Sequence, residues 1–191
     1  MKENKVLYGF LKIIYSTLLK VLYRPTAIGT ENIPLDGPVI FAGNHRHTFD
    51  PVVVMTHTKR FVHYMAKESL FKGLHGKMFK AMGLIKVYRT KKNPGAVFEA
   101  VEILKDGGTI GIFPEGTRNK TEDELLKFRT GAVRIAKESE SRIVPFAIKG
   151  EYALFKKRLI IEFGKPLDVK DMEIEKSNEL LRSEVLNLLR K

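Results

Sequence analysis

The sequence predicts an α/β fold: a single domain with a largely parallel or mixed central sheet flanked by helices. Short apolar runs bounded by glycine, proline or polar residues indicate buried strands, and they alternate along the chain with segments of helical spacing. This alternation is the pattern of α/β domains. With 191 residues, 43% of them hydrophobic, the chain is long and apolar enough for one compact domain.

The expected elements follow in a regular order. Strands are expected at 39–42, 61–67 and 83–89, at the start of 109–118, at 142–150 and at 159–167. Helices are expected at 94–108, at 131–139 and from about 171 to 190. Gly107 and Gly108 supply the stop of the first of these helices. Because sites in such folds lie where strands end, the segments after residues 42 and 112 are the candidates for function.

Composition narrows the classes of partner. The chain has 34 Lys and Arg against 22 Asp and Glu, a net charge of +12, which favours nucleic acid, anionic lipid, a phosphorylated substrate or an acidic carrier protein. No nucleic-acid partner is expected, because tryptophan, aromatic–basic interleaving and known binding motifs are lacking. The absence of cysteine excludes disulfides, cysteine-ligated zinc and a thiol nucleophile, and it fits an intracellular compartment.

The N-terminal segment 5–24 predicts an amphipathic helix, which Arg24-Pro25 ends. Lysines interrupt its apolar run, so it is too short to span a membrane, and no small-residue cleavage site marks a signal peptide. One narrow stripe is polar, and a wide surface around it is apolar. The stripe holds Lys5, Gly9, Lys12, Ser16 and Lys20.

Two placements of this helix compete. It can dock on the protein's own core, or it can lie in a membrane interface with its apolar face among acyl chains and its lysines toward lipid phosphates. The breadth of the apolar arc and the interfacial tyrosines favour the membrane. We therefore divide the chain into a membrane-associating helix, residues 1–25, and a catalytic domain, residues 26–191.

The segment GNHRHTFDP, residues 43–51, allows three interpretations. His45 and His47 could ligate a metal, but further ligands are not obvious and no metal is expected. Asp50 could cap a helix that has Pro51 as its first residue. Alternatively, a turn could bring Asp50 to one imidazole nitrogen of His45, leaving the other nitrogen to take a proton. No serine or cysteine nucleophile motif accompanies the pair, so the nucleophile would be a substrate hydroxyl.

A second polar segment, FPEGTR at 113–118, also follows an expected strand. Arg118 can grip a phosphate through a bidentate fork, and Glu115 can hydrogen-bond an alcohol. Arg89 and Lys67 end two other strands and could converge with them. Neither a P-loop nor a dinucleotide-binding glycine motif is present, which weakens nucleotide-hydrolysing or dinucleotide-binding roles.

Four segments in order resemble the four sequence blocks of the glycerolipid acyltransferases. NHRHTFD resembles the N-H-x(4)-D block, and GLIKVYR, FPEGTR and IVPFAI resemble the blocks that follow. FRTG, at 128–131, is similar to an element found just after the third block. Together they cover residues 44–148. Small departures are the run 86–88 in the second block and Arg129 where lysine is usual.

The resemblance implies the glycerolipid acyltransferase fold and transfer of a fatty acyl group to the sn-2 hydroxyl of lysophosphatidic acid, forming phosphatidic acid. It implies His45 as general base, Asp50 as its orienting partner, and Glu115, Gly116 and Arg118, with the intervening Thr117, as acceptor-binding residues. Arg89 would contribute to that acceptor site, and Lys67 is a weaker addition from the residues themselves.

The donor would be acyl-CoA or acyl carrier protein, with no bound cofactor. Lipid substrates predict a peripheral enzyme on an anionic membrane surface, at the cytoplasmic face of the cell membrane. Two alternatives remain open at this point: acylation of glycerol-3-phosphate or of another lysolipid, and a metal-dependent hydrolase that uses His45 and His47.

Overall fold

The protein folds around one mixed sheet, seen in a computed structural model that describes residues 4–88, 94–156 and 158–191. The sheet has seven strands in the order β1-β7-β6-β2-β5-β3-β4. Strands β6, β2, β5, β3 and β4 run parallel, whereas β7 lies antiparallel to β6 and β1 pairs parallel with β7. The predicted fold class is confirmed.

The elements alternate as the sequence indicated. The strands are β1 (Thr26–Ile28), β2 (Val39–Gly43), β3 (Val62–Lys67), β4 (Ile85–Val87), β5 (Thr109–Ile112), β6 (Arg142–Gly150) and β7 (Leu159–Phe163). The α-helices are α1 (Lys5–Leu22), α2 (Asp50–Thr56), α3 (Gly73–Ala81), α4 (Pro94–Lys105), α5 (Gly131–Glu138) and α6 (Ile174–Arg190). Two 3₁₀ turns, η1 (Thr30–Asn32) and η2 (Glu68–Phe71), complete the elements of the described residues.

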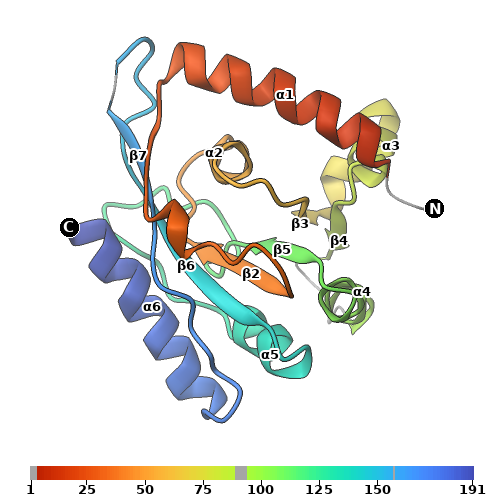
Figure 1. Ribbon diagram of the computed structural model, residues 1–191, viewed down its shortest axis with the longest axis vertical. Coiled ribbons are helices and arrows are strands. Elements are labelled where there is room, and N and C mark those ends of the chain that lie inside the picture. The colour runs from red at the N-terminus through yellow and green to blue at the C-terminus, as the bar shows by residue number, and fades with distance from the viewer. Residues whose placement is uncertain (1–3, 89–93, 157) are drawn as a thin grey trace.

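Helices cover both faces of the sheet (Figure 1). On one face, Ile40 and Ala42 of β2 pack in a core that includes residues of α4, α5 and α6. On the other, Val39 and Phe41 pack with α2 and with Leu19 of α1. Successive side chains of a strand point to opposite faces, so a fully buried apolar strand such as β2 serves both cores.

Parallel strands bring their carboxyl ends to one edge of the sheet. The loops that follow β2, β5, β3 and β6 therefore gather there, which places the two polar segments of the sequence on the same edge. Gly107 ends α4 with a φ of +78°, as its glycine pair predicted. Helix α3 was not predicted, because Gly73 and Gly76 weaken its helical pattern.

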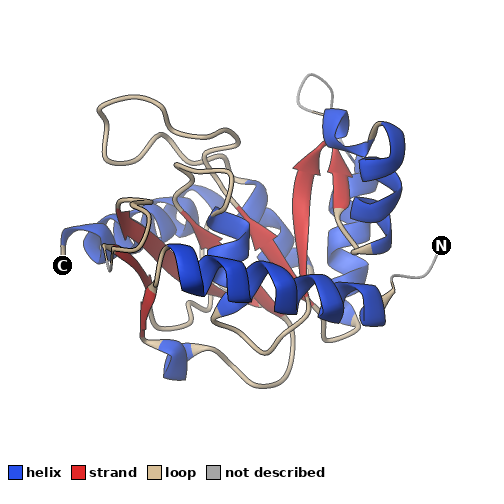
Figure 2. Ribbon diagram, turned by 90° about the horizontal axis from the view of Figure 1, so that it is seen from above, coloured by secondary structure: helices blue, strands red, loops and turns tan. Residues whose placement is uncertain are grey.

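Helix α1 lies across α2 as an outer layer (Figure 2). Tyr8 and Leu19 are buried against the protein, whereas the opposite face is apolar and exposed. The exposed residues are Val6, Phe10, Ile13, Ile14, Leu18 and Val21. One side of the helix thus docks on the core, and the other presents a broad apolar surface, whose contact with a membrane stays a prediction. Among the described residues, no helix is long and apolar enough to cross a bilayer.

One part of the predicted picture of this helix is wrong. Lys12 was placed on the stripe that faces lipid phosphates, but its ammonium group donates to the main-chain oxygen of Thr58 at 2.6 Å. Ser16 likewise turns inward, to the hydroxyl of Thr56. The loop after α2 exposes carbonyl groups that need a donor, and Lys12 supplies it. Lys5 and Lys20 remain exposed.

Adjacent leucines test which face of α1 docks. Leu19 is 3% exposed and Leu18 is 51% exposed. Leu19→Ala should lower the free energy of unfolding by about 2–5 kcal/mol, because it empties a packed site. Leu18→Ala should change it by less than about 0.5 kcal/mol. Urea unfolding measures both, and equal losses would contradict the docking described here.

Candidate active site

The site begins where β2 leaves the sheet. The main-chain pairing of β2 with β6 ends at Gly43 and Phe146, and the buried side chain of Asn44 continues it. Its amide donates to the carbonyl of Ile148 at 2.8 Å and accepts from the same residue's N–H at 2.7 Å. This two-point attachment lets the backbone turn away from the sheet without leaving buried polar groups unpaired.

His45 is held by its main chain on both sides. Its N–H donates to Oε1 of Glu115 at 2.7 Å, and its carbonyl accepts from the N–H of Asn119 at 2.6 Å. Both partners belong to the loop 113–130 that follows β5. The loop that contains FPEGTR therefore holds the main chain of the first motif through two hydrogen bonds. The position of the His45 imidazole thus depends on residues about seventy positions away along the chain.

The imidazole of His45 is oriented by two further contacts. Its Nδ1 lies 2.9 Å from Oδ2 of Asp50, and its ring stacks on Phe113 at 4.1 Å between centroids. An ionised carboxylate only accepts hydrogen bonds, so Nδ1 carries the proton and Nε2 carries the lone pair. Within the described residues, no protein group hydrogen-bonds to Nε2, and the side chain is 17% exposed. The ring can therefore take a proton from a bound group.

Asp50 is buried, and hydrogen bonds reach both of its carboxylate oxygens. Oδ2 accepts from His45 and from the main-chain N–H groups of Arg46 and His47, each at 2.8 Å. Oδ1 accepts from the hydroxyl of Tyr152. The dyad predicted from the sequence is thus assembled by the turn that precedes α2.

The alternative in which Asp50 caps this helix is wrong in detail. Asp50 is the first residue of α2, Phe49 occupies the cap position, and no side chain caps the helix end. The carboxylate turns back toward the preceding turn because the N–H groups of 46 and 47 and the His45 ring converge there.

The Glu115 carboxylate links the main chain of His45 to that of Leu126. Its second carboxylate oxygen accepts from the N–H of Leu126 at 2.9 Å, and the residue is 5% exposed. Burial raises the pKa of the Glu115 carboxyl, and the two main-chain N–H groups that it binds oppose the rise. The structure gives this carboxylate a task that the sequence did not indicate, and its contact with an acceptor alcohol stays a prediction.

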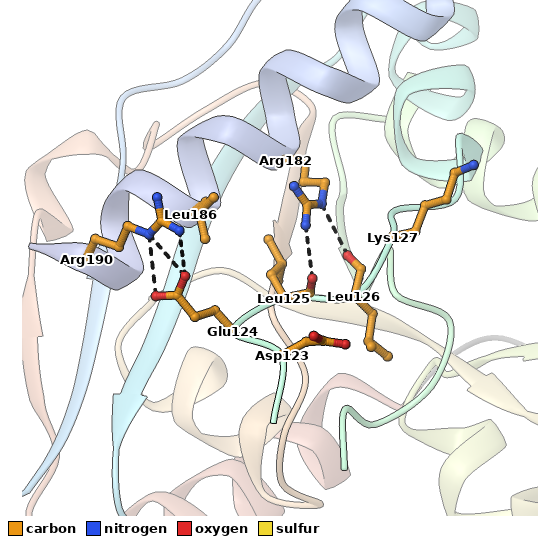
Figure 3. Close-up of a pocket in the computed structure, with 8 residues that line it drawn as sticks. All are labelled: Asp123, Glu124, Leu125, Leu126, Lys127, Arg182, Leu186 and Arg190. Atoms are coloured by element: carbon orange, nitrogen blue, oxygen red, sulfur yellow. Dashed lines mark hydrogen bonds and ion pairs between the residues drawn. The ribbon is translucent and has the colours of Figure 1, made fainter. Parts of the chain in front are cut away.

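Helix α6 fixes the segment that carries Leu126 (Figure 3). The guanidinium of Arg182 donates to the carbonyls of Leu125, at 3.0 Å, and Leu126. Arg190 pairs with Glu124 at 2.7 Å across the same hollow, which has a volume of about 360 Å³. Residues of loop 113–130 and α6 line this hollow. The contacts across it attach the loop that holds His45 to helix α6.

A basic rim adjoins His45. Arg118 donates to the hydroxyl of Thr48 at 2.6 Å, which brings the predicted phosphate ligand beside the first motif. Gly116 has a φ of +70°, and a Cβ there would lie 2.7 Å from Nε of Arg129. Glycine is therefore needed both for the turn and for the close approach of Arg129. Arg129, noted in the sequence only within FRTG, joins this rim.

The remaining predicted acceptor ligands are less defined. Thr117 is exposed on the same turn as Arg118. Lys67 is exposed at the end of β3, three residues beyond the last residue that pairs with β5. That offset corresponds to about 10 Å along a strand. Arg89 lies outside the described residues, so its predicted contribution is untested.

Metal ligation gains no support from the geometry. Within the described chain, no group of three or more His, Asp or Glu side chains is arranged to hold a metal ion. The ring of His47 stacks on Tyr152 at 4.0 Å, and its Nδ1 accepts from the N–H of Phe49. Nδ1 of His45 is occupied by Asp50.

Several supporting residues were not identified from the sequence. Asn44 and Phe113 lie within the recognised motifs, and their neighbours in those motifs were the available signal. Asn119 is one residue beyond FPEGTR. Tyr152 had no signal of any kind, because it lies in a loop about one hundred residues from Asp50.

Comparisons with known proteins place the chain in a family. Residues 24–149 match the family model described as Acyltransferase, so the chain belongs to the acyltransferase family. The matched segment includes both motifs and the dyad.

The names of the similar curated proteins specify one reaction within this family. A 1-acyl-sn-glycerol-3-phosphate acyltransferase of Bacillus subtilis is 31% identical over 189 residues, covering 95% of this chain and 94% of that protein. A protein of the same name from Borreliella burgdorferi is 34% identical over 140 residues, and the match spans about half of its length, 55%. The chain also resembles the crystal structure of PlsC, the 1-acyl-sn-glycerophosphate acyltransferase of Thermotoga maritima. That likeness has a TM-score of 0.76, 24% identity, and coverage of 96% of this chain and 76% of that one, and it supports the fold.

Glu115→Gln tests the clamp on His45. An amide has one acceptor oxygen, so one of the two buried N–H groups loses its partner. We expect the free energy of unfolding to fall by about 1–3 kcal/mol. Glu122→Gln, at an exposed position of the same loop, should change it by less than about 0.5 kcal/mol. Thermal unfolding distinguishes the two variants. An unchanged stability of Glu115→Gln would show that Glu115 does not hold the main chain of His45 in this way.

Proposed function

We propose that this protein transfers a fatty acyl group from an acyl thioester to the sn-2 hydroxyl of 1-acyl-sn-glycerol-3-phosphate, forming phosphatidic acid. The observation that carries the proposal is the His45–Asp50 pair, with Nε2 of His45 unengaged within the described chain and Arg118 beside it. The names of the curated relatives support the choice of acceptor.

The reaction follows from the orientation of the imidazole. Nε2 of His45 takes the proton of the acceptor hydroxyl as its oxygen attacks the thioester carbonyl. Asp50 stabilises the imidazolium that forms. The tetrahedral intermediate collapses with cleavage of the carbon–sulfur bond, and the departing thiolate receives the proton from Nε2. The products are an ester and a free thiol, and His45 returns to its neutral form without a covalent acyl-enzyme.

The oxyanion of the intermediate needs hydrogen-bond donors. The N–H groups of Arg46 and His47 already donate to Asp50, so this task falls to other donors at the rim. A cationic rim also suits the acceptor, whose phosphate carries negative charge. Arg118 and Arg129 lie on the loop that holds His45, so a phosphate bound there would present its glycerol hydroxyl near Nε2.

The donor in this proposal is acyl-CoA or acyl carrier protein. Both are anionic, and the net charge of +12 suits both. No bound cofactor takes part in the steps above, since base, orienting carboxylate and phosphate ligands are all side chains of the chain.

We place the enzyme on the cytoplasmic face of the cell membrane, held by α1. The outer face of α1 presents six large apolar residues to solvent, and a contiguous exposed apolar surface is typical of protein or membrane interaction sites. Lys5 and Lys20 are exposed beside it and suit anionic lipid headgroups. Acceptor and product are lipids, so such docking would bring the site to its substrates.

His45→Ala should lower kcat by about 10²–10⁴-fold, because the reaction loses its general base. His75→Ala, which removes an exposed histidine on α3, is the matched control and should retain activity. Circular dichroism checks that both variants fold. Turnover of His45→Ala near that of the control would reject the mechanism.

Arg118→Ala should act on binding. Loss of a phosphate ligand should raise KM for 1-acyl-sn-glycerol-3-phosphate about tenfold or more, with a smaller effect on KM for the donor. Steady-state kinetics with each substrate varied in turn measures both values. If only the donor value changes, the phosphate assignment is wrong.

Membrane docking is tested with exposed positions, because removing all of α1 would also expose the core around Leu19. Phe10→Ser with Ile13→Ser should weaken binding to phosphatidylglycerol-containing vesicles at least about tenfold, since two large apolar side chains no longer enter the interface. Phe98→Ser, 64% exposed on α4, is the control. Co-sedimentation that is equal for both proteins would place the membrane contact elsewhere.

A further inference from the structure

Tyr152 contacts the catalytic pair from a part of the chain that neither motif includes. It lies in the loop after β6, and its hydroxyl donates to Oδ1 of Asp50. The other carboxylate oxygen accepts from three donors of the turn 45–47, whereas within the described chain Oδ1 accepts from this hydroxyl alone. Asp50 is 1% exposed, so water does not readily replace a lost partner.

The ring of Tyr152 is held on both sides. It stacks on His47 at 4.0 Å between centroids, and it meets the ring of Tyr23 edge-on at 5.5 Å. Tyr23 caps α1, and the N–H of Phe155 donates to the carbonyl of Leu22 at the end of the same helix. Contacts with the first motif and with α1 thus fix the direction in which the hydroxyl points.

We propose that Tyr152 is a positioning residue for the proton transfer. Its hydroxyl fixes the plane of the Asp50 carboxylate and reduces the negative charge that Oδ2 presents to His45. The proposal rests on the function proposed above. A hydrogen bond to Oδ1 draws negative charge away from Oδ2, so the carboxylate stabilises the imidazolium less than an otherwise identical carboxylate without that bond. His45 can then release the proton to the leaving thiolate more readily.

The hydroxyl remains a donor throughout the working range of pH. Burial first, and then the charge of Asp50, raise the pKa of Tyr152 well above its ordinary value. The titratable or charged groups that face this cluster are His45 and His47 from the turn, Tyr23 from the end of α1, and Tyr64 from β3. Arg46 and Glu115 lie next to His45.

Tyr152→Phe keeps the ring and removes the hydroxyl. Without that donor, Asp50 holds the imidazolium more tightly, so the acid limb of the kcat/KM profile should move to higher pH by about 0.5–1 unit. Activity at neutral pH should fall about tenfold. The matched control is Tyr8→Phe, which removes another buried hydroxyl, the acceptor of the N–H of Val62. It carries a similar structural cost but should leave the acid limb in place.

A second readout does not depend on turnover. NMR titration of the substrate-free protein follows the His45 ring, whose signal is assigned by its absence in His45→Ala. The titration midpoint should rise in Tyr152→Phe and stay in place in Tyr8→Phe. An unchanged midpoint in Tyr152→Phe overturns the proposal, whatever the activity. Failure of the acyltransfer mechanism is seen separately, as full activity of His45→Ala.

Discussion

The site is arranged around the hydrogen bonds of the buried Asp50 carboxylate. Four donors surround it: the ring of His45, two main-chain N–H groups and the hydroxyl of Tyr152. A charge so deeply buried is stable only when its hydrogen-bonding capacity is met, and here three of the four donors are supplied by the turn that His45 occupies. The same contacts that stabilise the carboxylate therefore orient the imidazole.

The parallel sheet makes this arrangement possible. Because β2, β5 and β6 end at one edge, three loops far apart in sequence meet there. The loop after β2 carries the pair, the loop after β5 clamps the main chain of His45, and the loop after β6 adds Tyr152. Helix α6 anchors the second of these loops through Arg182. Stability and chemistry thus depend on the same backbone contacts.

The sequence alone predicted the fold class, the order of the main elements and the pairing of His45 with Asp50. These features are encoded locally. Buried strands are continuous apolar runs, and a turn can bring together two side chains that lie five positions apart, as it does for His45 and Asp50. The contacts of Lys12 and Glu115 were not predicted, because their partners are main-chain groups of distant loops. Tyr152 escaped for the same reason, since only the tertiary fold brings its loop to Asp50.

Asp50 fixes one tautomer of His45, with the proton on Nδ1 and the lone pair on Nε2. Nitrogen-15 chemical shifts of the ring, measured in the substrate-free protein at a pH where the imidazole is neutral, report this directly. We expect a protonated Nδ1 and an unprotonated Nε2. A ring protonated on Nε2, or an even mixture of the two neutral forms, would contradict it.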